Sequence, residues 1–210
     1  MEISSTAYHS MYDTNGWQET VDPDWMLAED IARYTGVLTL KLLDSMVIPL
    51  DLDVLGRTMM SWFTSNLLPA AIEYDCILND YENATFSLRR AISEFEFVAN
   101  EMQGAIAELV HVIGTEGRSV SEEDMERVEH YNELLRSIAK EFMYSEGLPS
   151  RTWHKNILWN TAIEDGPSNV YPHIWYALQY QCEEEMIRKA FNVTQNLIDD
   201  AWLKVYRYLD

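Results

Sequence analysis

Histidine is the side chain in this sequence best suited to bind a metal or transfer a proton near neutral pH. The histidines do not lie three or four residues apart, the spacing that puts two ligands on one helix face. The HExxH, Walker, GxGxxG and GxSxG motifs of common enzyme classes are also absent. The histidines therefore do not predict a self-contained metal site; they are His9, His111, His130, His154 and His173.

Carboxylates and thiols are the other groups able to do chemistry. The acidic runs Glu122 to Asp124 and Glu183 to Glu185 lie where helices are expected to begin, and carboxylates there interact favourably with the helix dipole. We interpret both runs as solvated helix starts in preference to metal sites. Cys76 and Cys182 form no CxxC pair and cannot build a disulfide framework, so we interpret them as packed thiols.

Composition and charge exclude several classes of partner. The chain has 15 Lys and Arg against 35 Asp and Glu, a formal charge of −20, so nucleic acid and anionic lipid would repel it. With 47% hydrophobic residues it is expected to be globular. No apolar run approaches the roughly 20 residues of a membrane span, and Met1 to Ser10 lacks the features of a signal peptide. We expect no direct membrane insertion by this chain, and the sequence leaves its localisation open.

The elements that must position these residues are predicted to be helices, because Gly and Pro are few and cluster at boundaries. One helix is expected to follow Asp22-Pro23-Asp24 and stop at Pro49, and a shorter one to run from about Asp53 to Leu68, ended by Pro69. The clearest amphipathic helix spans Phe86 to Ile113, where apolar residues recur in steps of four and three.

The second half of the chain predicts two more long helices. Ser121 is expected to cap a helix that Gly147-Leu148-Pro149 closes, and a final one runs from Ile187 to Leu209. A short helix at Ile174 to Tyr180 follows an irregular, aromatic-rich stretch. No segment alternates as a strand would, so we predict an all-α bundle of about four long helices with short accessory helices and a long ordered loop at about 147–171.

Four segments in order resemble one known family. Tyr8-His9-Ser10 with the residues after it is similar to the end of the peptidase domain in the glutamate carboxypeptidase and transferrin receptor family. Ile48-Pro49-Leu50-Asp51 resembles its LPFD turn, Gly147-Leu148-Pro149-Ser150-Arg151 its GLP-R loop, and Tyr171-Pro172-His173-Ile174 its FPGI motif. The set covers nearly the whole chain from Tyr8 onward.

The resemblance implies a transferrin receptor-like dimerisation domain at residues 22–210, preceded at residues 1–21 by a remnant of the end of a zinc peptidase domain. It implies a homodimer, or pairing with a full-length relative. Seven Trp and twelve Tyr offer interface anchors, although such residues also fill cores.

The resemblance also implies what Tyr8 and His9 would do in an active member: His9 would bind zinc and Tyr8 would help to hold substrate. The family's other zinc ligands lie upstream of this sequence, so we expect no catalytic residues, no cofactor in this chain and no enzyme activity of its own, with zinc in the family parent. The alternative is that the chain is the C-terminal fragment of a zinc-dependent exopeptidase, a carboxypeptidase or aminopeptidase, whose catalytic domain is missing from it.

Two further features bear on the parent protein. Where active carboxypeptidases of the family carry a Lys-Tyr pair for the substrate carboxylate, this chain has Glu164-Asp165-Gly166-Pro167, which would repel such a substrate. Family members are commonly membrane-anchored with this domain on the lumenal or extracellular side. The sequons at Asn83 and Asn192 are candidate glycosylation sites that fit that placement.

Overall fold

The computed structural model describes residues 10–73, 81–115, 120–149, 151–160, 169–181 and 183–209. The chain divides into two compact units, Met1–Ser45 and Met46–Asp210. The assignment of residues 1–21 to the end of a peptidase domain stays a prediction. Among the described helices, none has the length and apolar content needed to cross a bilayer.

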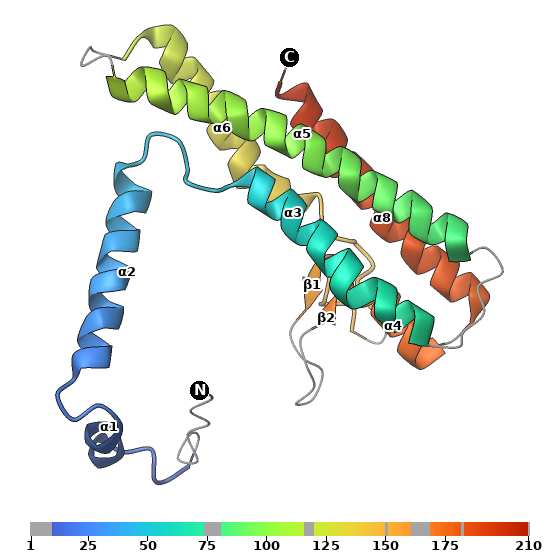
Figure 1. Ribbon diagram of the computed structural model, residues 1–210, viewed down its shortest axis with the longest axis horizontal. Helices are drawn as coiled ribbons and strands as arrows, with labels where there is room; N and C mark the ends of the chain where they lie inside the picture. The colour runs from blue at the N-terminus through green and yellow to red at the C-terminus, as the bar shows by residue number, and fades with distance from the viewer. Residues whose placement is uncertain are drawn as a thin grey trace. The chain divides into compact units, whose positions relative to one another are not determined.

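The first unit contains two helices, α1 (Asn15–Val21) and α2 (Met26–Asp44), shown in Figure 1. As the sequence predicts, Asp22 marks the start of α2: its carboxylate accepts hydrogen bonds from the amides of Leu27 at 3.2 Å and Ala28 at 3.0 Å. α2 ends at Asp44, five residues before Pro49. α1 was not predicted, because its short polar sequence has no apolar stripe.

The second unit is built on a 35-residue helix, α5 (Tyr81–Thr115), with α3 (Leu52–Trp62) and α8 (Glu184–Arg207) packed along it (Figure 1). This confirms the predicted Phe86 to Ile113 helix and the final long helix. The apolar residues of α5 in steps of three and four are buried in the core; they are Leu88, Ile92, Phe95, Ala99, Met102, Ile106 and Leu109. The prediction of an all-α fold is therefore confirmed.

The predicted helix end at Pro69 is wrong. α3 continues through a π-helical turn, Phe63–Leu67, into α4 (Leu68–Glu73), which contains Pro69. In the π-turn the amide of Leu68 donates to the carbonyl of Phe63, five residues back. A proline clashes with the carbonyl four residues before it in a regular α-helix. The wider turn just before Pro69 relieves that clash and lets the helix continue.

The third long helix is shorter than predicted. Ser121 caps α6 (Glu122–Ser137) by accepting from the amide of Asp124 at 3.1 Å, as expected, but α6 gives way to a 3₁₀ turn at Ile138–Lys140. The chain then leaves the helical path because Phe142 turns inward and packs edge-on against Phe95, with 5.7 Å between the ring centroids. The predicted closure at Gly147 is thus a loop turn and not a helix end.

The remaining segment returns to helix through a small hairpin-like ribbon. β1 (Trp159–Asn160) pairs antiparallel with β2 (Asn169–Val170), and α7 (Pro172–Tyr176) continues as a π-turn at Ala177–Gln181. These helical turns confirm the short helix predicted at Ile174 to Tyr180. The two strands were not predicted, because two residues are too few to show an alternating pattern.

Two glycines provide a matched test of the packing between α3 and α5. A Cβ on Gly56 of α3 would lie 2.8 Å from the Cα of Glu96 on α5, whereas one on Gly104 would meet nothing within 4 Å. We expect Gly56→Ala to lower the free energy of unfolding by about 1–2 kcal/mol net, because α3 must move away from α5. At a concentration where the chain is monomeric, Gly104→Ala should raise it by about 0.5–1 kcal/mol through helix propensity. Urea unfolding measures both, and a Gly56→Ala variant as stable as the parent would contradict this packing.

Candidate functional site

Several residues singled out from the sequence lie outside the described residues: Tyr8, His9, Cys76, Cys182 and the 164–167 stretch. The roles predicted for them stay predictions. Among the residues that the structure describes, no group of three or more His, Cys, Asp or Glu side chains is placed to hold a metal ion. The described side chains therefore do not fit the zinc site that the family resemblance implies for an active parent.

The two sequon asparagines lie on helices. Asn83 is exposed in the first turn of α5 and Asn192 is exposed in the middle of α8. Both positions are accessible at the surface of the second unit. Their glycosylation stays a prediction.

The described histidines fall into two groups. His111 is exposed on α5, and His130 on α6 lies against Tyr208 with ring centroids 4.4 Å apart. These placements agree with their interpretation as polar helix positions. His154 lies in the loop, its ring centroid 5.8 Å from that of Trp153. His173 differs from all of them, because it is buried at the start of α7.

The two family-like turns of the second unit have clear physical causes. Asp51, the last residue of the LPFD-like turn, caps α3 by accepting from the amide of Val54 at 2.9 Å. Just before it, the buried amide of Asn132 on α6 accepts from the backbone of Ile48 at 2.8 Å and donates to the carbonyl of Met46 at 2.8 Å. Sequence reasoning missed Asn132, because no local pattern shows which distant backbone groups a helical asparagine will reach.

The GLP-R-like turn depends on its glycine. Gly147 has a φ of +71°, and a Cβ there would lie 2.3 Å from the carbonyl oxygen of Thr152. Two backbone hydrogen bonds close the turn, from Arg151 to Leu148 and from Leu148 to His154, both at 2.9 Å. The buried side chain of Leu148 anchors the turn to the protein.

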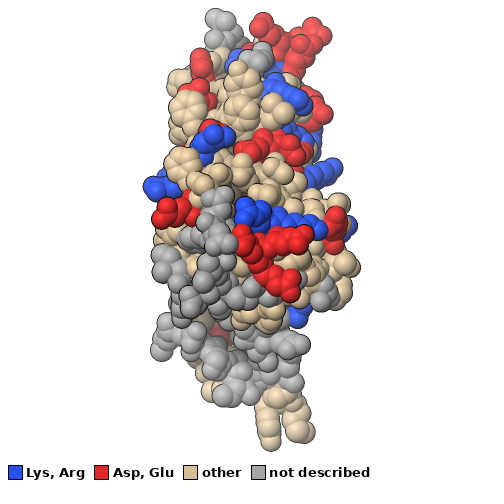
Figure 2. Space-filling view, turned by 90° about the vertical axis from the view of Figure 1, so that its right-hand side faces the viewer, with Lys and Arg blue, Asp and Glu red and all other residues tan. Residues whose placement is uncertain are grey.

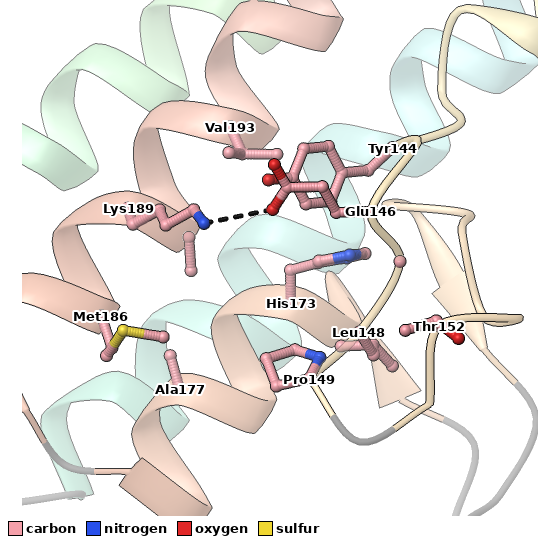
Figure 3. A pocket seen from close by; sticks show the side chains of 12 residues that line it. Tyr144, Glu146, Leu148, Pro149, Thr152, His173, Ala177, Met186, Lys189 and Val193 are labelled. Carbon is pink, nitrogen blue, oxygen red and sulfur yellow. Dashed lines mark hydrogen bonds and ion pairs between the residues drawn. The ribbon is translucent and has the colours of Figure 1, made fainter.

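This turn covers a cavity of about 290 Å³ between the loop, α7 and α8 (Figure 3). His173 lies in its wall, with its ring edge-on to Tyr144 and 5.4 Å between the centroids. Lys189 of α8 and Glu146 of the turn form an ion pair of 3.2 Å whose side chains are largely exposed. The other lining residues are mostly apolar; they are Gly147, Leu148, Pro149, Thr152, Ala177, Met186, Ala190 and Val193.

The charges around the cavity are balanced. The pKa of Glu146 is lowered mainly by a hydrogen bond from Tyr144 and to a smaller extent by Lys189. In turn, Glu146 raises the pKa of Lys189. Glu146 also raises the pKa of Tyr144. Burial lowers the pKa of His173 to about 4, with the backbone of Gly147 opposing part of the shift. At neutral pH the cavity is therefore lined by the uncharged imidazole of His173 and by the ion pair between Lys189 and Glu146.

Two exposed apolar surfaces lie elsewhere on the second unit. On α5, Phe86 and Phe97 are each 68% exposed. A second patch, in the loop that follows the 3₁₀ turn, consists of Met143, Trp153 and Trp159 around a hollow that also contains Lys155 and Asn156. The sequence predicted aromatic interface anchors without saying which ones, because core and surface aromatics share the same composition signal.

The pKa of His173 predicts a specific acid sensitivity. Since its pKa is 6.5 unfolded and about 4 folded, the unfolded chain binds more protons between these values. The free energy of unfolding should therefore fall as the pH drops from about 6.5 towards 4, by at most roughly 3 kcal/mol from this residue.

His173→Phe should remove this part of the pH dependence, measured by urea unfolding across that range. His154→Phe in the neighbouring loop is the matched control and should keep the parent slope. Equal slopes for His173→Phe and the parent would contradict the assignment.

Two known proteins are similar to this chain over about three quarters of its length. The chain is 25% identical over 158 residues to aminopeptidase NAALADL1 of Rattus norvegicus, covering 74% of this chain and 20% of the relative. It is 27% identical over 170 residues to aminopeptidase NAALADL1 of Mus musculus, covering 78% of this chain and 21% of the relative. The chain thus spans about a fifth of the length of these curated relatives. The profile of the transferrin receptor-like dimerisation domain matches residues 85–204, from the first turn of α5 into the last turns of α8, and the chain belongs to that family.

Proposed function

We propose that this chain is a non-catalytic module that pairs two protomers, as a homodimer or with a longer relative. The observation that carries the proposal is the match of residues 85–204 to a family of dimerisation domains. Those residues include the two helices, α5 and α8, that form the centre of the second unit. The functional surface is then expected on the exposed face of this helical core.

The exposed face of α5 is one candidate for that surface, and it lies within the matched residues 85–204. Four residues of α5 fall within about 20° of one line along the helix, if each residue turns the helix by about 100°. They are Phe86, Ser93, Phe97 and Gly104. Both phenylalanines are largely exposed, and a Cβ at Gly104 would meet no neighbour within 4 Å. Exposed aromatics with an open glycine on one line allow a second helix to approach closely and bury both rings.

Charged residues border this line and would form the polar rim of the interface. Arg90 pairs with Glu94 at 3.3 Å on α5, and Arg57 pairs with Asp53 at 2.7 Å on α3, beside the groove that Phe97 lines. On the face seen in Figure 2, basic and acidic side chains likewise lie next to one another with uncharged surface between them. A two-fold pairing would place such mixed charges opposite a second copy of themselves.

Two exposed aromatics of similar exposure test this surface. Phe97 is 68% exposed and Trp153, in the loop patch, is 71% exposed. We expect Phe97→Asp to shift the chain from dimer to monomer in sedimentation equilibrium at physiological ionic strength, because a desolvated carboxylate would face its copy. The dissociation constant of the dimer should rise at least about tenfold.

Trp153→Asp is the matched control and should leave the dimer intact. Dissociation by Trp153→Asp with no effect of Phe97→Asp would move the interface to the loop patch. A parent chain that is strictly monomeric at micromolar concentrations would overturn self-association.

A second candidate function is supported by the likeness to two aminopeptidases over about a fifth of their length. We propose as the alternative that this domain is the C-terminal part of a zinc-dependent exopeptidase. An antibody against residues 187–210 tests this by immunoblot of the native protein in its own cells. A band several times heavier than 24.5 kDa is expected if the alternative holds, and a band near that mass contradicts it.

A further inference from the structure

The imidazole of His173 is buried at the start of α7. The residue is only 5% exposed, and no group in the part of the chain that the structure describes meets either ring nitrogen with the distance and angle of a hydrogen bond; the nearest influence is the Gly147 backbone, close enough to raise its pKa. A buried polar group without a partner is destabilising, so such groups are rare and need a reason. Here the imidazole lies in the wall of a cavity, where a bound molecule can reach it.

The cavity has the dimensions and lining of a small-molecule site. Its 290 Å³ lies at the lower end of the about 300–1,000 Å³ range of ligand pockets. An apolar cavity of about 150 Å³ already binds benzene in a well-known engineered lysozyme, so this one has room for a larger ring system. In Figure 3 the side chains of His173 and Ala177 come from α7 and the π-turn after it, Met186 and Val193 from α8, and Leu148 and Pro149 from the turn opposite.

The chemistry of the lining selects the ligand. A neutral imidazole has one N–H donor and one acceptor nitrogen, which match a hydroxyl group because a hydroxyl both donates and accepts. The charges at the cavity, on Lys189 and Glu146, already satisfy each other at 3.2 Å. A ligand with its own charge would find no free counter-charge among these lining residues and would lose its hydration.

We propose that the cavity between the loop residues 144–149 with Thr152, α7 and α8 binds a small neutral molecule, an aromatic or alicyclic alcohol, whose hydroxyl group hydrogen-bonds to His173. The apolar body of the molecule packs against Leu148, Ala177 and Met186. The proposal is independent of dimerisation, because Phe86 and Phe97 do not line this cavity.

Three probes that differ in one group test the proposal by isothermal titration calorimetry with the full chain at neutral pH. 2-Naphthol is expected to bind, and naphthalene to bind about 2- to 13-fold more weakly, which is the worth of one net hydrogen bond. 2-Naphthoate, which is charged, is expected not to bind. No binding of 2-naphthol up to its solubility limit, or equal binding of naphthalene, would overturn the proposal.

Variants and a spectroscopic measurement test whether 2-naphthol binds in this cavity. His173→Phe should abolish the preference for 2-naphthol over naphthalene, and Val193→Phe should fill the cavity and weaken both. His154→Phe is the matched control and should change neither affinity. In the parent chain with nitrogen-15-labelled histidine, 2-naphthol should shift the ring nitrogens of His173, a measurement that needs no variant to fold. An unshifted His173 spectrum, or an unchanged preference in His173→Phe, would exclude this site.

Discussion

The second unit depends on one buried hydrogen bond, in which the hydroxyl of Tyr171 donates to the carbonyl of Met59 at 2.7 Å. It joins α3 to a residue 112 positions later in the chain, and the Tyr171 amide donates to Leu158 at 3.0 Å. Tyr171 is fully buried with a φ of +49°, a conformation that costs a residue other than glycine about 1–3 kcal/mol. The surrounding packing maintains it, and the positions of α7 and of the cavity beside α7 follow from it.

Polar contacts of this kind set the register of an otherwise apolar core. Asn132 holds both sides of the 46–48 segment, and Gln103 of α5 accepts from the amide of Leu52 at 3.2 Å at the start of α3. Apolar burial along α5 supplies most of the driving force but has little directional preference. The side-chain amides therefore decide where α3 begins relative to α5 and α6, and α3 in turn presents the carbonyl that Tyr171 requires.

The sequence predicted the features that depend on local pattern. The stripe on α5, the Ser121 cap and the final helix are periodic or short-range signals, and the GLP-R-like turn has its glycine where the backbone needs one. The cavity was not predictable, because it requires Tyr144, His173 and Lys189 to meet from three separate segments. Pro69 and Phe142 misled the sequence reasoning for a related reason: tertiary packing decided whether the helix continued there.

The π-turn at 63–67 links the number of residues in the continuous helical segment of α3 and α4 to the presence of Pro69. The residues Met59, Phe63, Leu67 and Ala71 are all buried, yet the 12 steps from the first to the last would carry the stripe roughly 120° around a regular α-helix at about 100° per step. The wider turn cancels part of that rotation by accommodating one additional residue. A one-residue deletion here would restore both regular geometry and a continuous apolar face, but it would return Pro69 to a clashing position. In related sequences, a change in the length of this segment and the loss of the proline at position 69 should therefore occur together.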